Sequence, residues 1–234
     1  MRWRLIIEDG VSDSYGLAAD EGLAHRVGHD QSIPTLRLYT YRSYSALVGR
    51  FQTIENELHG DFCRKNDVAI NRRPTGGGAI IMGEDQLGIA LTIPGKAEDT
   101  YGRARELMER FAAGVIQALR SLSIQSGFRR KNDLEVNGRK IAGLGIYRDV
   151  SGGLLFHASL LLDMDISLML QILNTPFEKT SDKGFRTIEA RIETIRHAIG
   201  RSISMEEVRE KMAEAYARTF GVEFLNEEFA PDEI

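Results

Sequence analysis

Apolar residues recur along this chain with two different spacings, and their alternation predicts a mixture of helices and short strands. Over Tyr101–Leu122, apolar residues such as Leu107 and Phe111 return every three or four positions, which predicts the strongest helix, with one stripe facing the core. Further helices are predicted at Ser14–Val27, Glu55–Lys65, Ile166–Leu173 and Ser204–Phe220. Alternating or short apolar runs predict strands at Trp3–Ile7, within Leu36–Phe51, and at Val68–Asn71, Ala79–Met82, Leu87–Ile93 and Leu154–Leu162.

The order of these elements indicates a single α+β domain. Ala79–Met82 and Leu87–Ile93 are expected to pair around the turn Gly83–Asp85. Ser204 is expected to cap the last helix, with Glu207 completing a capping box. The chain contains no repeat, low-complexity segment or linker, so we assign residues 1–225 to one domain and expect residues 226–234 to form a loose acidic tail.

Composition narrows the classes of protein to which this chain can belong. Its 234 residues, 42% hydrophobic and 27% charged, suffice for a substantial core. A net charge of −4 gives no reason to expect nucleic-acid binding, and no apolar run approaches the roughly 18 residues of a membrane span. A single cysteine excludes an internal disulfide, and Met1–Asp9 lacks the apolar core of a signal peptide. We therefore expect a cytoplasmic protein that binds neither nucleic acid nor membrane.

The first candidate for chemistry is Lys140, two residues beyond a predicted tight turn. Two alternating runs meet at Asn137-Gly138, the dipeptide most typical of a two-residue hairpin loop. The next strand carries the small residues Gly143 and Gly145, so a substrate could approach its backbone beside the lysine amine. A lone hairpin lysine is more often simply exposed to water, so this candidate depends on its neighbours.

A second candidate is the glycine-rich segment Asn71–Ala79, which follows a predicted strand. Consecutive glycines at Gly76–Gly78 let backbone N–H groups converge on an anion. The paired Arg72 and Arg73 supply permanently charged, planar donors for phosphate or carboxylate. No Gly-Lys-Ser/Thr follows and the glycines are adjacent rather than spaced, so this is neither a Walker loop nor a dinucleotide fingerprint. Three glycines alone more often form a flexible turn; with the arginines beside them they indicate an anion site.

Asp133 and His157 complete the candidate site. Asp133 and Lys140 flank the hairpin, with Asn132 beside the carboxylate. Asp133 could hold a divalent cation, which a nucleoside triphosphate would need, although a turn or surface carboxylate is the plainer alternative. His157 lies in an apolar strand, where a satisfied core histidine is more common than a catalyst.

Together these motifs resemble the lipoate–protein ligase A family, within the wider biotin/lipoate ligase and octanoyltransferase fold. That family carries an Arg-Arg-x-Ser/Thr-Gly-Gly-Gly-Ala/Val loop, which Arg72–Ala79 matches. It also carries an Asn-Asp-Leu…Lys-Ile hairpin, which Lys131–Gly143 matches. Its His-Gly/Ala-Ser/Thr-Leu strand is matched by His157–Leu162. Weaker similarities are found at Ala46–Gln52, Leu173–Asn174 and Lys183–Arg191. The resemblance covers nearly the whole chain and implies an α+β fold with a mixed, largely antiparallel central sheet flanked by helices.

In that family a fatty-acid carboxylate attacks the α-phosphate of ATP, and the acyl group of the acyl-adenylate then moves to a lysine of a carrier domain. The resemblance implies that Lys140 is catalytic and neutralises charge on the acyl oxygen and the α-phosphate. It also implies that Asp133 helps to bind Mg²⁺ and that the acid is lipoate or octanoate. The residues expected to contact ATP or the acyl substrate are Arg72, Arg73, Thr75, Gly76, Gly77, Gly78, Ala79, Asn132, Asp133, Gly143 and His157.

Octanoyltransferases are the main alternative, because Gly138–Ile146 also resembles their lysine motif. They use no ATP and pass the acyl chain through a thioester on a cysteine. That cysteine lies either just after the helix that follows the His157 strand or in the loop before the lysine hairpin. Here those places read Leu173–Pro176 and Ser126–Arg129, and the sole thiol, Cys63, lies in a distant predicted helix, where it is expected to be buried or inert. The sequence therefore favours a ligase. A biotin ligase, whose phosphate loop normally has spaced glycines, and a non-catalytic protein that binds lipoyl carriers are weaker alternatives.

Two departures from the ligase pattern bear on substrates and partners. Ala79–Asp85 lacks the His-Asp pair that often follows the glycine loop, and the chain ends about where the large catalytic domain would end. We therefore expect a separately encoded accessory subunit to support activation. The acceptor is expected to be a lipoyl carrier, either a glycine-cleavage H-like protein or a dehydrogenase E2-like lipoyl domain. Which carrier it is, and whether lipoate or octanoate is preferred, stays open.

Overall fold

An eight-stranded sheet runs through the molecule, which is described by a computed structural model at residues 1–96, 101–129, 132–174, 189–230 and 233. Its strands are β1 (Arg2–Val11), β2 (Thr35–Tyr41), β6 (Gln86–Pro94), β7 (Gly127–Arg129), β8 (Asp133–Val136), β9 (Arg139–Arg148), β10 (Gly153–Leu161) and β11 (Glu223–Asn226). They lie in the order β11-β1-β2-β6-β10-β9-β8-β7. β1 is parallel to β2 and β11, and the other neighbours are antiparallel, which confirms the predicted mixed sheet.

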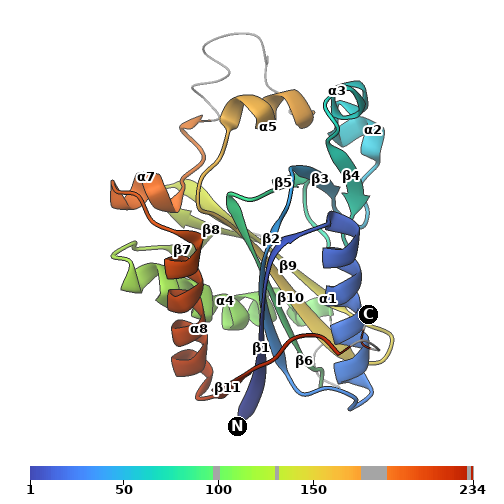
Figure 1. The fold of residues 1–234 in the computed structure, drawn as a ribbon, viewed down its shortest axis with the longest axis vertical. Helices are drawn as coiled ribbons and strands as arrows, with labels where there is room; N and C mark the ends of the chain where they lie inside the picture. The colour runs from blue at the N-terminus through green and yellow to red at the C-terminus, as the bar shows by residue number, and fades with distance from the viewer. Residues whose placement is uncertain (97–100, 130–131, 175–188, 231–232, 234) are drawn as a thin grey trace.

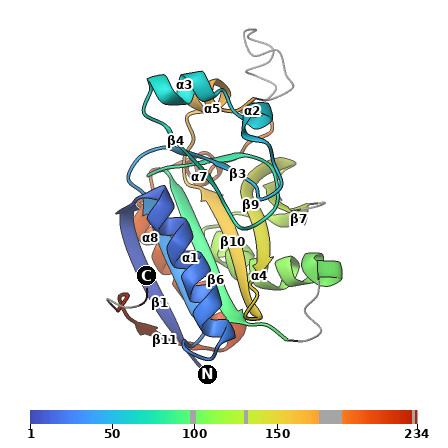
Figure 2. The ribbon, with the colours of Figure 1, turned by 90° about the vertical axis from the view of Figure 1, so that its right-hand side faces the viewer.

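Three long helices cover the two faces of this sheet (Figures 1 and 2). α4 (Ala104–Ser121), preceded by the short 3-10 turn η1 (Tyr101–Arg103), packs with α8 (Met205–Phe220) on one face. α1 (Asp13–Gly28) lies on the other. The stripe predicted from the sequence is confirmed, because Leu107 and Phe111 are buried in the core beneath α4. Burial of each such side chain contributes about 1.5–3 kcal/mol to the stability of the fold. This face of the sheet holds more buried apolar residues than the other, so it forms the main core.

Side-chain alternation along β10 decides which residues face the site. Leu154, Phe156 and Leu160 point into the core beneath α4 and α8. His157 and Ser159 therefore point to the opposite face, where they line a cavity.

A smaller sheet of three strands forms a second layer at one end of the α1 face (Figure 2). Its strands are β3 (Ser45–Val48), β4 (Ala69–Arg72) and β5 (Ile80–Met82), in the order β4-β3-β5. The short helices α2 (Ile54–Glu57), α3 (Gly60–Lys65) and α5 (Ile166–Ile172) lie beside it. Val48, Cys63 and Ile172 form a separate buried cluster there. A further helix, α7 (Ile195–Ile199), precedes α8.

Two predictions about these elements are wrong. β5 and β6 do not pair, because β6 already has β2 and β10 on its two edges, and β5 pairs with β3 instead. The helix predicted at Glu55–Lys65 is two helices. Buried Leu58 separates them, in an extended conformation that forms a bridge with Leu173.

Near the C-terminus the structure also differs from expectation. Ser204 caps α8 as predicted, its Oγ accepting from the Glu207 backbone N–H at 3.1 Å, but the Glu207 carboxylate accepts from Arg201 instead of closing a capping box. Within the acidic tail, the Glu233 carboxylate accepts two hydrogen bonds from Arg4, at 2.6 and 3.0 Å. Among the described helices, none combines the length and apolar character needed to cross a membrane.

Candidate active site

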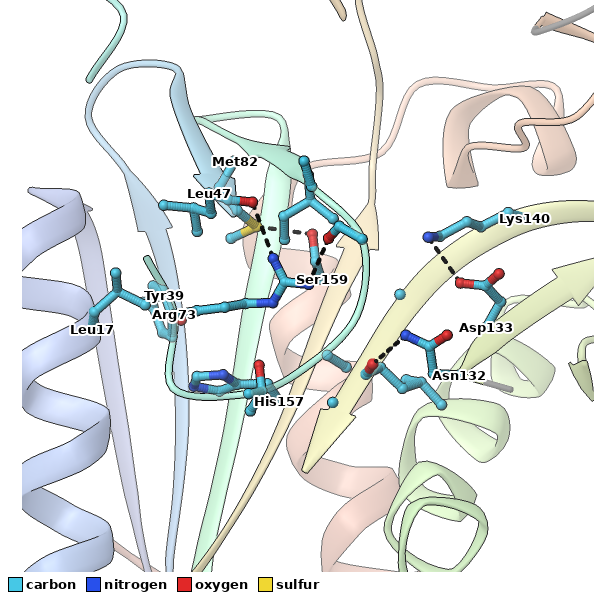
Figure 3. Close-up of a pocket in the computed structure, with 18 residues that line it drawn as sticks. Leu17, Tyr39, Leu47, Arg73, Met82, Asn132, Asp133, Lys140, His157 and Ser159 are labelled. Carbon is cyan, nitrogen blue, oxygen red and sulfur yellow. Dashed lines mark hydrogen bonds and ion pairs between the residues drawn. The ribbon is translucent and has the colours of Figure 1, made fainter. Parts of the chain in front are cut away.

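A cavity of about 250 Å³ lies between the large sheet, α1 and the glycine-rich loop (Figure 3). One part of its wall is apolar and includes Leu17, Leu47 and Met82. On the other side of the close-up, Lys140 and Asp133 project from the hairpin of β8 and β9. The cavity thus joins an apolar compartment to a charged rim, as an amphiphilic acid requires.

Lys140 is held at this rim by both its side chain and its backbone. Its Nζ lies 2.8 Å from the Asp133 carboxylate. The Lys140 N–H donates to the Arg191 carbonyl and its own carbonyl accepts from the Glu193 N–H, both at 2.8 Å. A Cβ at Gly143 would lie 3.2 Å from Nζ, so a side chain there would crowd the amine. The predicted open space beside Lys140 therefore depends on Gly143.

Arg73 lies in the middle of the close-up, and its guanidinium is directed at the glycine loop (Figure 3). It donates to the carbonyls of Leu47, Gly76 and Gly78, at 3.0, 3.1 and 2.6 Å. Burial lowers the pKa of Arg73 to about 10, and within the described residues no carboxylate is paired with it. A buried cation bonded only to carbonyls favours an anion beside it, so Arg73 both fixes the loop and makes the cavity attractive to negative charge.

The glycine loop itself contributes two different features. The Thr75 Oγ1 is buried and has no hydrogen-bond partner among the described residues, although Thr75 lines the cavity. Gly77 has φ +104°, and a Cβ at Gly49 would lie 2.1 Å from the Gly77 carbonyl oxygen, so both positions require glycine. Of the predicted loop residues, Thr75, Gly78 and Ala79 line the cavity, whereas Gly76 and Gly77 do not.

The structure separates the two arginines that the sequence grouped together. Arg72 lies outside the cavity, and its guanidinium donates to the carbonyls of Gly49, Arg50 and Gln52. Asn132 does line the cavity, with its side-chain amide donating to the Leu144 carbonyl at 3.0 Å.

His157 is joined to a buried charge network that the sequence analysis missed. Its Nε2 lies 2.7 Å from the Asp20 carboxylate, which is fully buried in α1. Asp20 also accepts from Arg37 at 2.8 Å and from the Tyr39 hydroxyl at 3.0 Å. A signal was present in the sequence, since Asp20 occupies the apolar stripe of α1, three positions from both Leu17 and Leu23.

Charge partners determine the ionisation of this network. Burial disfavours the charged form of Asp20, but Arg37 and His157 outweigh that effect and lower the pKa of the Asp20 carboxyl below its ordinary value. Burial together with Asp20 raises the pKa of the Tyr39 hydroxyl, which therefore stays protonated and donates. Asp20 is thus a buried anion that orients the His157 ring at the cavity wall.

Asp133 was predicted to hold a metal ion. In the described part of the chain, no three His, Cys, Asp or Glu side chains come together to hold one. Mg²⁺ needs only one or two protein carboxylates when substrate phosphates supply its other ligands, so a single carboxylate is compatible with a metal that arrives with a nucleotide.

Cys63 lies away from the cavity. It is fully buried in α3, in the cluster that includes Val48 and Ile172, and it does not line the cavity. Burial raises the pKa of its thiol. The expectation of a buried cysteine is therefore confirmed.

Comparison with known proteins places these features in a family. The lipoyl protein ligase A/B catalytic domain matches residues 13–217. The octanoyltransferase LipM of Symbiobacterium thermophilum is 29% identical over 94% of this chain and 87% of its own length. Several other similar curated relatives carry the same LipM name.

Solved structures show the same fold. A lipoate-protein ligase A bound with ATP has a TM-score of 0.85 and 22% identity, covering 100% of this chain and 91% of the other. A bi-partite lipoate protein ligase of Thermoplasma acidophilum, described together with its E2 lipoyl domain, has a TM-score of 0.81 and 24% identity, covering 100% and 89%. The biotin/lipoate ligase fold expected from the sequence is confirmed.

Proposed function

This chain belongs to the lipoyl protein ligase A/B catalytic-domain family, and we propose that within this family of lipoylation enzymes it is an ATP-dependent lipoate–protein ligase. It would activate lipoate or octanoate as the acyl-adenylate and transfer the acyl group to a lysine of a lipoyl carrier domain. The cavity, with its apolar wall and charged rim, suits a short acyl chain that ends in a reacting carboxyl group.

One observation carries the choice of a ligase. The thioester route of the octanoyltransferases needs a cysteine near the lysine hairpin or after the helix that follows the third central strand. Ser126 and Gly127 occupy the first place, and Leu173 and Asn174 begin the second. The only thiol of the chain, Cys63, is buried in a different cluster and lines no part of the cavity. Direct attack of the acceptor amine on an acyl-adenylate needs no such thiol.

In the first step, a carboxylate oxygen attacks the α-phosphorus of ATP and pyrophosphate leaves. Arg73 and Lys140, which both line the cavity, would supply positive charge to the carboxylate and the phosphate. Cations that the protein holds in place stabilise such charge without reorganising during the reaction. Mg²⁺ bound to the nucleotide would neutralise phosphate charge, with Asp133 as its protein ligand.

In the second step, the neutral acceptor amine attacks the acyl carbon, the bond from that carbon to the phosphate oxygen breaks, and AMP leaves as the nitrogen loses a proton. Lys140 stabilises the developing oxyanion and the departing phosphate, which requires a fixed cation rather than a nucleophile. Its pairing with Asp133 and the backbone bonds to Arg191 and Glu193 supply that fixity.

An octanoyltransferase is the second candidate, because most of the similar curated relatives carry that name. It would take octanoate from an acyl carrier protein and need no ATP. The two activities are separated by exchange of labelled pyrophosphate into ATP with lipoate, octanoate or biotin. Exchange with lipoate or octanoate supports the ligase. Acyl transfer from octanoyl carrier protein without ATP, in the absence of exchange, would overturn it.

We also propose that efficient activation uses a separately encoded accessory subunit, as the bi-partite ligase of Thermoplasma acidophilum suggests by analogy. Exchange should then rise when candidate partner proteins are added. A rate that is high with the purified chain and unchanged by any partner would contradict this part of the proposal.

A further inference from the structure

Phe51 is an exposed aromatic side chain on a loop beside the cavity. Its exposed fraction is 87%, and it is the only aromatic among the large hydrophobic residues found exposed in the described part of the chain. The other strongly exposed internal one, Val150 at 94%, lies on the turn between β9 and β10. An aromatic ring left in water at this place has no role in the core and calls for another explanation.

The loop that carries Phe51 is held in a fixed conformation. Arg72 donates to the carbonyls of Gly49, Arg50 and Gln52, at 2.9, 3.2 and 2.7 Å. The Gln52 side chain accepts from the Gly49 N–H at 2.8 Å. These hydrogen bonds hold the backbone before and after Phe51. The loop would therefore lose little backbone entropy when a partner binds the Phe51 ring.

The same loop is joined directly to the cavity wall. The Arg50 N–H donates to the carbonyl of Thr75, which lines the cavity, at 3.0 Å. Arg50 places its guanidinium carbon 6.0 Å from the centre of the Phe51 ring and 5.5 Å from that of Tyr147. An aromatic residue next to an arginine on a rigid loop is the composition typical of a protein-binding hot spot.

We propose that Phe51 anchors the carrier domain that brings the acceptor lysine to the cavity, an inference that rests on the proposed function. The acceptor of that reaction is a folded domain, so when its lysine enters the cavity, its surface must cover the rim. Phe51 is an exposed apolar group whose loop is bonded to the cavity wall, and it would be buried by such a domain. This also gives Arg72 a role outside the cavity, since it holds the loop that presents Phe51.

The proposal separates the two half-reactions. Phe51→Ala should raise the KM for an apo lipoyl domain of the E2 type, or for an apo H protein, roughly tenfold or more. It should leave pyrophosphate exchange within twofold of wild type, because activation involves no carrier. Phe51→Tyr keeps the ring and should stay close to wild type. Val150→Ala removes an equally exposed apolar side chain at the β9–β10 turn and should change neither reaction.

Direct binding of a fluorescently labelled apo lipoyl domain or H protein tests the docking surface without chemistry. A Kd that rises about tenfold or more in Phe51→Ala, but not in Val150→Ala, supports the proposal even if no ATP-dependent exchange is found. In that case the ligase function fails and the docking surface stands. An unchanged Kd and KM in Phe51→Ala, or no binding of either carrier by the wild type, would overturn the docking surface while leaving the ligase function to its own test.

Discussion

Removal of the Asp20 carboxylate should destabilise the protein strongly, because Asp20 is the shared partner of buried Arg37, buried Tyr39 and the partly buried His157. Arg37 and Asp20 side chains are both 0% exposed. Asp20→Ala would leave the Arg37 guanidinium with Glu8 as its remaining carboxylate and would release the His157 ring and the Tyr39 hydroxyl. Breaking a buried ion pair costs about 3–5 kcal/mol. Since Glu8 stays, we expect the lower end, about 3 kcal/mol, and a fall in Tm of roughly 6–12 °C for a chain of this size.

Urea unfolding followed by circular dichroism measures this change, with Asp61→Ala as the control. Asp61 is also paired with an arginine, Arg64, but its side chain is 86% exposed, so its loss should cost less than about 1 kcal/mol. A double-mutant cycle of Asp20→Ala with Arg37→Met should give a coupling energy above about 1 kcal/mol. A loss below about 1 kcal/mol for Asp20→Ala, or strict additivity in the cycle, would refute the reasoning.

The same network predicts a pH dependence of definite sign. The pKa of Asp20 is lower in the folded protein than its ordinary value, so its ionised form stabilises the fold. That contribution is complete above the unfolded pKa of about 3.9 and is lost as pH falls through the lower, folded pKa. The stability difference between wild type and Asp20→Asn, measured by urea unfolding at a series of pH values, should therefore narrow as the pH falls below about 4.

Three further predictions concern catalysis. Lys140→Ala should lower acyl transfer at least about 10²–10³-fold with an unchanged circular dichroism spectrum, because a fixed cation is lost at the reacting centre; retained activity would refute its catalytic role. Cys63→Ala should keep most of its acyl transfer, and mass spectrometry should find no acyl-thioester in the wild type, whereas complete loss of transfer in a folded variant would revive the thioester route. The Glu193 carboxylate accepts from the Thr194 N–H, and the Glu193 backbone N–H holds the Lys140 carbonyl. Glu193→Ala should therefore lower kcat about tenfold or more with little change in KM, whereas Glu193→Gln should keep most of the wild-type kcat. Equal losses of kcat in both variants would argue against a positioning role.

Many helices and strands could be predicted from the spacing of apolar residues, because each of these elements must turn its apolar side chains toward the core. The stripe of α4 and the alternating residues of β10 each face one continuous core, so their periodicity survives in the sequence. Pairing between strands is a different matter. β5 and β6 are neighbours in sequence and looked like a hairpin, but β6 pairs with β2 and β10, which come from distant parts of the chain.

The candidate site was predicted in part for the same reason. Lys140, Asp133, Asn132 and Thr75 all line one cavity, although they come from two separate segments. Asp20 was missed because a single acidic residue in an apolar stripe looks like a break in the pattern until its partner, here His157, is known. Residues that act through a buried partner leave little trace in sequence spacing.

The position of Lys140 shows why spacing alone could not complete the site. Strict alternation along β9 would put Lys140 and Gly143 on opposite faces, since they are three residues apart. In the structure Leu134 pairs with Ala142 and Glu135 with Lys140, so Ile141 is an extra, bulged residue. The bulge returns Lys140 to the face of Gly143, and Ile192, from a segment much later in the chain, pairs with Lys140 at that point. The direction of the lysine amine is therefore fixed by a tertiary contact, so the segment around Ile192 belongs to the site as much as the hairpin does.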